Sequence, residues 1–274
     1  MVSQAVRDLC WVINSPSLID GPGVARAERL DPDAVDAEAL AAFLTEQPPG
    51  HRVGRYFEQL LYFWLLHVRK VDVIEHGLQL KDGKITVGEI DFLYRDEADV
   101  LIHCEISVKF FLCAPGSSPS SYPGPNARDN FERKVGKLFD KQLPASVGRV
   151  EGIGRREAFV KGMIFYRIDG RVAPTPERLA PGHLRGVWCR NTSIDDLADL
   201  GDLFAIVNKP QWLAPVGDAT VMDADAFRDY VEDHFLGPAH PIMVSVRTAD
   251  SADREVQRVI VVDEQWPALG ANPH

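Results

Sequence analysis

Apolar and polar residues alternate along residues 85–94 and 100–112 of this chain. An alternation with a period of two is typical of β-strands, in which successive side chains point to opposite faces of a sheet. A turn centred near Ala98 joins the two segments into a predicted β-hairpin. Because the strands pair symmetrically about this turn, Asp91 is expected to lie opposite Glu105.

One face of this hairpin is polar and the other is apolar. The polar face carries acidic residues, a serine and a lysine: Glu89, Asp91, Glu105, Ser107 and Lys109. Directly opposed residues have Cβ atoms about 4.5–5.5 Å apart, so Asp91 and Glu105 repel each other unless a cation lies between them. A hard divalent cation suits two carboxylates. A second interpretation also fits, because an exposed sheet face often carries mixed charge and Lys109 then simply neutralises Glu105.

The spacing of apolar residues elsewhere predicts further helices and strands. Residues 53–68 have apolar positions three and four apart, as on one face of a helix. A helix over 126–143 is expected to begin at Asn126, as its N-cap, and to end before Pro144. The remaining predicted helices are 4–14, 33–46 and 224–234, and the remaining predicted strands are 71–80, 159–168, 184–190, 242–247 and 256–262. The segment Pro115 to Pro125 is predicted to be a flexible loop.

This order of elements predicts an α/β fold with a mixed central β-sheet flanked by helices. No internal repeat and no clean linker divides the 274 residues, a length that suits one large domain. We predict a single α/β domain over 1–274. Its core spans about 51–170, with an N-terminal helical extension over 1–50 and a C-terminal α/β extension over 171–274.

Composition narrows the class of protein. The chain is 45% hydrophobic and 26% charged, and no apolar run approaches the ~18 residues of a membrane span. The N-terminal residues do not resemble a signal peptide, so we expect a cytoplasmic protein without membrane association. Four scattered cysteines are expected to be buried thiols, and neither a zinc site nor a disulfide framework.

The net charge of −10 argues against a protein that coats nucleic acid nonspecifically. The segment 126–167 differs from the rest, because it holds ten bases and five acids. This basic segment is a candidate contact for nucleic acid. The alternative is a solvated helix face with ion pairs between residues four positions apart.

The order of a helix, three strands, a helix and a strand, with acids on the second and third strands, resembles the core of the PD-(D/E)XK nuclease-like superfamily, αβββαβ. Several short blocks are also similar to the bacterial domain of unknown function family 1853. These blocks are Arg7-Asp8-Leu9, Gly54-Arg55-Tyr56-Phe57-Glu58, Gly88-Glu89-Ile90-Asp91-Phe92-Leu93, Glu105-Ile106-Ser107-Val108-Lys109, Gly124-Pro125-Asn126 and His183-Leu184-Arg185-Gly186.

The superfamily resemblance implies roles for particular residues. It implies that Asp91 and Glu105 hold a catalytic Mg²⁺ or Mn²⁺, and that Glu58, on the first helix, completes or extends the metal site. The superfamily usually has its lysine two residues after the third-strand acid, where this chain has Ser107. Lys109 comes two residues later, on the same face, and is the candidate for that role.

Three further polar residues are expected to lie near these candidates. Glu89 is an additional candidate metal ligand that the motif does not require. Gln142 is expected to be a helix-end residue in solvent, and contact with the phosphate backbone is the alternative. His103 shares the face of Glu105 and is expected to be structural, and a role as a ligand or a base is the alternative.

These observations favour a metal-dependent enzyme that hydrolyses phosphodiester bonds of DNA or RNA. Lys109 would orient or activate the attacking water and stabilise developing negative charge. The alternatives are a catalytically inactive nuclease-fold module that binds nucleic acid or a protein partner, and a hydrolase of another phosphoester.

Overall fold

A computed structural model describes residues 2–117, 120–237 and 240–268. The chain folds into two compact units, which are described separately. The first unit consists of Met1–Lys109, Arg133–Gly162 and Glu177–His183, and the second of Phe110–Glu132, Met163–Pro176 and Leu184–His274. The two longest strands, β3 (Leu101–Cys113) and β4 (Ile153–Arg167), each pass from the first unit into the second. A single domain over 1–274 stays a prediction.

The N-terminal part of the first unit is helical, as predicted. Helices α1 (Gln4–Asn14), α2 (Ala37–Glu46) and α3 (Val53–Phe63) bury apolar faces, and α3 continues as the π-helix η2 (Trp64–Val68). Helix α2 begins later than predicted because Asp36 caps it, accepting hydrogen bonds from the first helical N–H groups. The residues just before it form a separate short 3₁₀ turn, η1 (Pro32–Ala34).

Strands β1 (Asp72–Asp82), β2 (Ile85–Arg95), β3 and β4 form the sheet of the first unit in that order. The pairs between β2 and β3 run from Phe92 opposite Cys104 to Arg95 opposite Leu101, so the hairpin centres on residue 98, as predicted. Strands β3 and β4 are parallel, since Gly154 lies beside Leu101 and Gly162 lies beside Lys109.

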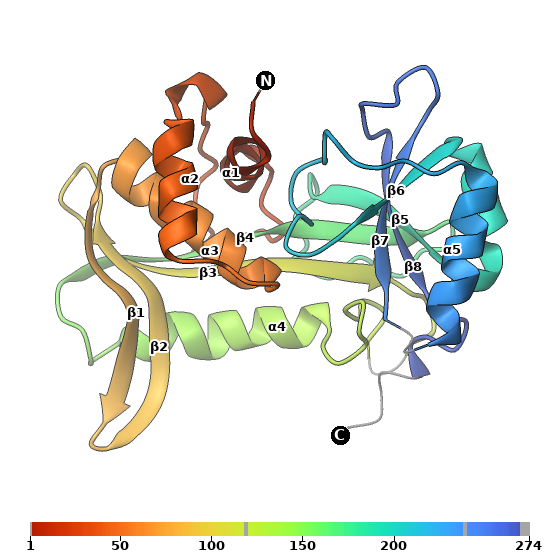
Figure 1. Ribbon diagram of the computed structural model, residues 1–274. Coiled ribbons are helices and arrows are strands. Elements are labelled where there is room, and N and C mark those ends of the chain that lie inside the picture. The colour runs from red at the N-terminus through yellow and green to blue at the C-terminus, as the bar shows by residue number, and fades with distance from the viewer. Residues whose placement is uncertain (1, 118–119, 238–239, 269–274) are drawn as a thin grey trace. The chain divides into compact units, whose positions relative to one another are not determined.

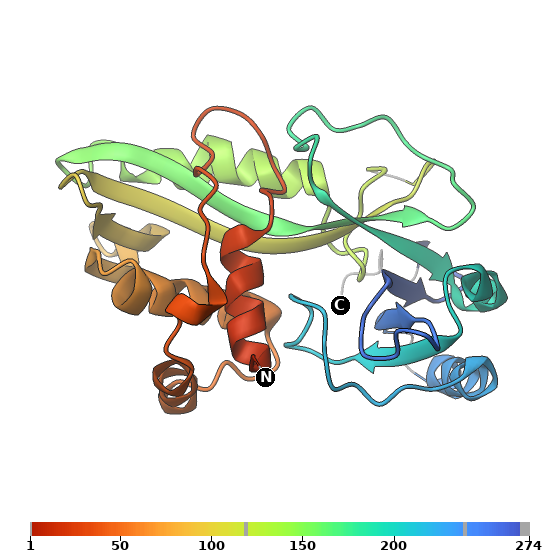
Figure 2. The same ribbon diagram turned by 90° about the horizontal axis from the view of Figure 1, so that it is seen from above.

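Helices cover both faces of this sheet. In Figures 1 and 2, α1 and α3 lie on one side of β3 and β4, and α4 (Phe131–Lys137) lies on the other. Aromatic contacts join α3 to the sheet: Tyr62 packs on Phe92 with ring centroids 5.7 Å apart, and Phe57 packs on Phe159 at 6.0 Å. Both faces of β3 are therefore withdrawn from solvent, which the alternating sequence pattern did not indicate.

The prediction of a continuous helix over 126–143 is wrong at its start. Helix α4 begins at Phe131, because the N–H of Gly124 bonds to the carbonyl of Asp129 and closes a tight turn in which Ala127 has φ of 53°. After α4 the chain continues as the π-helix η3 (Leu138–Gln142) and the 3₁₀ helix η4 (Leu143–Ser146). Of the loop predicted at 115–125, residues 118 and 119 lie outside the described part.

The second unit contains the C-terminal ends of β3 and β4 and strands β5 (Leu184–Arg190), β6 (Leu203–Val207), β7 (Ile242–Arg247) and β8 (Gln257–Val262). The strand order is β3-β4-β5-β8-β7-β6. Helix α5 (Ala224–Leu236) and the 3₁₀ segment η5 (Asn191–Asp199) pack on its core. Strand β6, an apolar run of five residues, was not predicted.

The structure is thus a mixed α/β fold whose strands pair mostly in antiparallel fashion. All four cysteines are free, and Cys104, Cys113 and Cys189 are buried as expected, whereas Cys10 is half-buried. None of the helices in the described part is both long enough and apolar enough to cross a membrane.

We expect Gly162→Ala to destabilise the protein by about 3 kcal/mol, because Gly162 has φ of +149° and a Cβ there would overlap the carbonyl oxygen of Lys109. Urea unfolding measures the change. Gly182→Ala is the matched control, since no atom lies within 4 Å of the added Cβ. Equal stability of the two variants would contradict the close approach of β4 to β3.

Candidate functional site

The candidate site lies in the first unit, where β2 and β3 stop pairing. The paired stretch ends with Phe92 and Cys104, so Asp91 and Glu105 are the next two residues on the two strands. At this point a side chain replaces the backbone ladder: the N–H of Ile106 donates to Asp91 Oδ2 at 2.8 Å. This bond holds the carboxylate of Asp91 against the start of the unpaired part of β3.

The surroundings of Asp91 disfavour its ionised form. Burial and the neighbouring carboxylate of Glu105 raise the pKa of Asp91 to about 7, although the hydrogen bond from Ile106 acts in the opposite direction. Glu58 and Glu89 add to the repulsion. The four carboxylates that were proposed as metal ligands therefore act on one another electrostatically. A cation placed among them would relieve this repulsion.

Glu105 is completely buried, with 0% of its surface exposed. Each of its carboxylate oxygens has a side-chain partner: His103 Nε2 lies 2.8 Å from Oε1, and Gln142 Nε2 donates to Oε2 at 2.6 Å. The expectation that Gln142 ends a helix in solvent is therefore wrong. Gln142 is the last residue of the π-helix η3, a type of turn that is frequent at functional sites.

His103 extends this network away from Glu105. It is also 0% exposed, and its Nδ1 lies 2.8 Å from the hydroxyl of Ser146, which in turn accepts a hydrogen bond of 2.9 Å from Arg156 Nε. The sequence placed His103 on the face of Glu105 but gave no sign of Ser146 or Arg156. Both come from elements that follow β3 by more than 30 residues.

The other two candidate carboxylates, Glu58 and Glu89, do not belong to the hydrogen-bond network around Glu105 that is described above. Glu58, on α3, bonds to His76 of β1 with 2.6 Å between Oε1 and Nε2, so one of its oxygens is already engaged. The ring of His76 stacks on Phe92 at 4.7 Å, which fixes this pair beside the sheet. Glu89 is exposed and lies opposite Gln79 in the β1–β2 ladder.

Lys109 lies further along β3. It is four residues after Glu105, which corresponds to about 13 Å along an extended strand. Its carbonyl oxygen packs against Gly162 of β4, and its side chain is half-buried. The backbone thus puts Lys109 on the predicted face but does not bring it next to Glu105.

The donor set fits one class of metal site. In the residues that the structure describes, no three His, Cys, Asp or Glu side chains are grouped as a ready cation cage. Zinc and calcium sites need such a cage. Mg²⁺ differs, because one or two carboxylates hold it together with waters and substrate phosphates. Asp91 and Glu105, which repel each other when no cation is bound, match that second arrangement.

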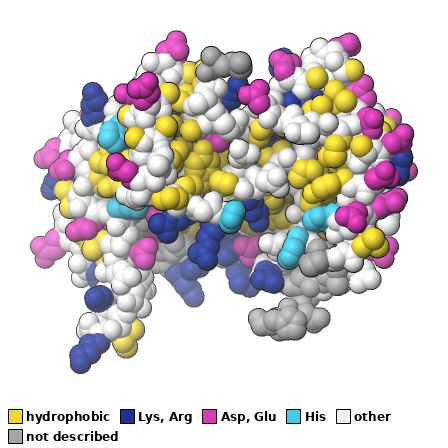
Figure 3. All heavy atoms as spheres, viewed as in Figure 1, with side chains coloured by type: hydrophobic (Ala, Val, Ile, Leu, Met, Phe, Trp, Pro, Cys, Tyr) yellow, Lys and Arg dark blue, Asp and Glu magenta, His cyan; other side chains and the backbone are white. Residues whose placement is uncertain are grey.

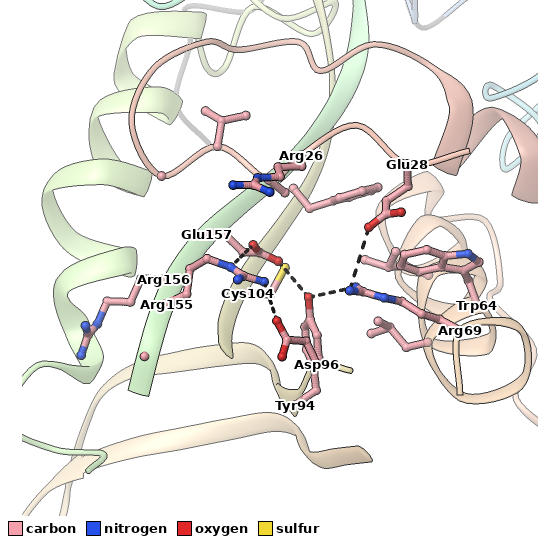
Figure 4. Close-up of a pocket in the computed structure, with 17 residues that line it drawn as sticks. Arg26, Glu28, Trp64, Arg69, Tyr94, Asp96, Cys104, Arg155, Arg156 and Glu157 are labelled. Carbon is pink, nitrogen blue, oxygen red and sulfur yellow. Dashed lines mark hydrogen bonds and ion pairs between the residues drawn. The ribbon is translucent and has the colours of Figure 1, made fainter. Parts of the chain in front are cut away.

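A cavity of about 600 Å³ opens on the opposite face of the same strands. Figure 4 shows a series of ion pairs and hydrogen bonds among the residues that line it. Arg155 pairs with Asp96 and with Glu157, and the hydroxyl of Tyr94 bonds to Glu157 and to Arg69. Cys104 lines this cavity. Because neighbouring residues of a strand point to opposite faces, Glu105 points away from it. The cavity and the Glu105 carboxylate thus lie on opposite faces of β3, although Arg156, which bonds to Ser146, also lines the cavity.

Comparison with known proteins places the chain in a family. A family model described as a domain of unknown function, DUF1853, matches residues 7–262. The chain belongs to this family. No curated protein and no solved structure matches it. The region matched in this DUF1853 protein includes every candidate residue of the site.

We expect Asp91→Asn to stabilise the metal-free DUF1853 protein at pH 8 by about 4 kcal/mol, since each pKa unit corresponds to about 1.4 kcal/mol. The pKa of Asp91 is raised in the folded state, from an ordinary value of 3.8 to about 7. The folded protein therefore binds the proton more tightly, and wild-type stability falls as the pH rises from 4 to 7.

The gain should disappear at pH 4, where the carboxyl of Asp91 is protonated in the folded protein. Chemical denaturation at both pH values measures the difference. Asp99→Asn is a suitable control, because Asp99 is exposed on the β2–β3 turn. A loss of stability in Asp91→Asn at pH 8 would mean that Asp91 does not suffer the repulsion described above.

Proposed function

We propose that this DUF1853 protein is a metal-dependent enzyme that hydrolyses phosphodiester bonds of DNA or RNA. The observation that carries the proposal is the pair Asp91 and Glu105, two carboxylates held side by side at a cost that a bound cation would remove at the pH values where Asp91 is ionised. Active sites often contain a buried charged group that lowers the stability of the folded protein. The element order α3-β1-β2-β3-α4-β4 supports the proposal, since it resembles the core of PD-(D/E)XK nucleases.

The proposed roles follow from position. Asp91 and Glu105 would hold Mg²⁺ or Mn²⁺, and Glu58 would extend the site from α3. When bound, such an ion polarises a phosphoryl oxygen and lowers the pKa of a water molecule. Lys109 would orient the attacking water and stabilise the negative charge that develops on the phosphoryl group.

A basic surface supports nucleic acid as the substrate. Arg133, Lys137 and Lys141 are exposed and four residues apart, so they share one side of α4 and η3. Lysine and arginine side chains gather in the lower middle of Figure 3, over the part of the view where Figure 1 draws α4. The same helical segment ends with Gln142, which bonds to Glu105. A nucleic acid held by these bases would lie beside the carboxylate pair.

One observation favours a second candidate, an inactive module that binds nucleic acid or a protein partner. Glu105 is 0% exposed and both of its oxygens already have partners. A carboxylate enclosed in this way is also what a purely structural network contains. The two candidates differ in what they need: an enzyme needs a cation, whereas the module keeps its affinity without one.

Calorimetric titration of Mn²⁺ and Mg²⁺ tests the proposal. We expect saturable binding to the wild type and a loss of at least about tenfold in affinity for both Asp91→Asn and Glu105→Gln. Asp99→Asn serves as the control for removal of one negative charge. Incubation of the same proteins with single-stranded and double-stranded DNA and RNA then measures cleavage. Nucleic acid binding that survives both amide variants, with no cation binding, would favour the inactive module.

We expect the double variant Lys137→Gln, Lys141→Gln to bind nucleic acid more weakly and with a smaller salt dependence, because each phosphate contact contributes about one unit to the slope of log affinity against log salt. Fluorescence anisotropy at several salt concentrations measures the slope. Arg29→Gln, which removes an exposed base elsewhere in the first unit, is the matched control. An unchanged slope would exclude this surface from the interface.

A further inference from the structure

A continuous line of hydrogen bonds joins Arg156 to Glu105 within the first unit. Arg156 Nε donates to Ser146 Oγ at 2.9 Å, Ser146 Oγ lies 2.8 Å from His103 Nδ1, and His103 Nε2 lies 2.8 Å from Glu105 Oε1. The residues come from β4, η4 and β3. Ser146, His103 and Glu105 are each 0% exposed. Solvent is therefore excluded from the two contacts of His103, whereas Arg156 at the end of the line is half-buried.

Along this line each group donates a hydrogen bond to the next, from Arg156 towards Glu105. A guanidinium has no acceptor, so Arg156 can only donate, and Ser146 accepts with one lone pair. The hydroxyl proton of Ser146 is then free to donate to His103 Nδ1. In a neutral imidazole this leaves the proton on Nε2, where it is donated to Glu105.

The opposite tautomer does not satisfy the same atoms. With its proton on Nδ1, His103 would donate to Ser146, and a lone pair on Nε2 would face a lone pair of the Glu105 carboxylate. Two acceptors that face each other at 2.8 Å in this buried position repel. The proton assignment is thus inferred from the hydrogen-bond network as a whole.

The order serine, histidine, acid is also that of a hydrolytic triad. A nucleophilic serine must be reached by its substrate, however, and Ser146 has no exposed surface. One lone pair of its oxygen is also engaged by Arg156. Burial and the arginine therefore favour a role for Ser146 in holding His103, and not in attacking a substrate.

We propose that Ser146 and Arg156 are positioning residues, which fix His103 in the tautomer whose Nε2–H is donated to Glu105. Glu105 Oε1 is held by His103 and Oε2 by Gln142, so its carboxylate has one orientation. The effect on cation affinity rests on the proposed function, since it requires that Glu105 binds the ion. Outer partners of a metal ligand typically change affinity 10- to 100-fold when they are removed.

The first test needs no metal. Two-dimensional ¹H–¹⁵N NMR of wild-type protein labelled at histidine shows which ring nitrogen carries the proton, and His103→Gln identifies the resonances of His103. We expect one proton, on Nε2. A proton on Nδ1, or on both nitrogens, would overturn the proposal. This measurement is independent of whether the protein is an enzyme.

The second test measures Mn²⁺ affinity by calorimetry. We expect Ser146→Ala and Arg156→Met to bind about 10- to 100-fold more weakly than the wild type, and Arg156→Lys, which keeps a cationic donor, to recover most of the loss. Thr45→Ala removes a hydroxyl that bonds only within α2 and is the matched control. Unchanged affinity in Ser146→Ala and Arg156→Met would overturn the proposal.

The other possible outcomes distinguish a failure of the proposed function from a failure of the positioning role. If the wild type binds no Mn²⁺, the proposed function fails, and the NMR result alone decides the tautomer. If Ser146→Ala does not fold, as judged by circular dichroism, the comparison of Arg156→Met with Arg156→Lys replaces it. Covalent labelling of Ser146 by a fluorophosphonate, detected by intact mass, would overturn the positioning role in favour of a nucleophile.

Discussion

Repulsion between two carboxylates at the end of the β2–β3 ladder is the constraint on which the rest of the site depends. Asp91 and Glu105 follow the last backbone pair, and the Ile106 N–H that would continue the ladder donates to Asp91 instead. Regular pairing between β2 and β3 therefore stops where these two carboxylates lie. A purely structural sheet gains nothing from this arrangement, because like charges that face each other across strands destabilise it.

The two faces of β3 separate two kinds of polar environment. On one face, Glu105 and His103 belong to a network closed by η3, η4 and β4. On the other, Cys104 lines a cavity in which Arg155 pairs with both Asp96 and Glu157. Since adjacent side chains of a strand cannot reach the same face, the cavity does not supply a ligand to the carboxylate pair.

Much of the local structure was predictable from the period of the hydrophobic pattern and from the residues that mark turns. The register of the hairpin followed from symmetry about Ala98, and β5 and β7 have the predicted bounds. The start of α4 was not predictable in this way, because the turn at Gly124 depends on a hydrogen bond to Asp129 that competes with helix formation. Strand β6 was missed although its run of apolar residues carried the signal.

The candidate site was predictable to a different extent. Asp91 and Glu105 were found from alternation alone, since both belong to one hairpin. Ser146 and Arg156 could not be found, because their contacts with the network join segments that are distant in the sequence. Gln142 was wrongly assigned to solvent, since a helix end was expected to be exposed and this one is turned onto Glu105 by the packing of η3 on the sheet.

The two carboxylates have unequal surroundings, and this asymmetry bears on how the site would work. Glu105 is enclosed and held by two side-chain donors, whereas Asp91 is half-buried with one backbone donor and a pKa of about 7. Paired titratable groups in different environments generally have different roles. Near neutral pH the charge on Asp91 changes while Glu105 stays fixed in place. In the proposed enzyme, Asp91 would therefore be the residue through which proton and cation compete for the site, and Glu105 would be the one that sets its geometry.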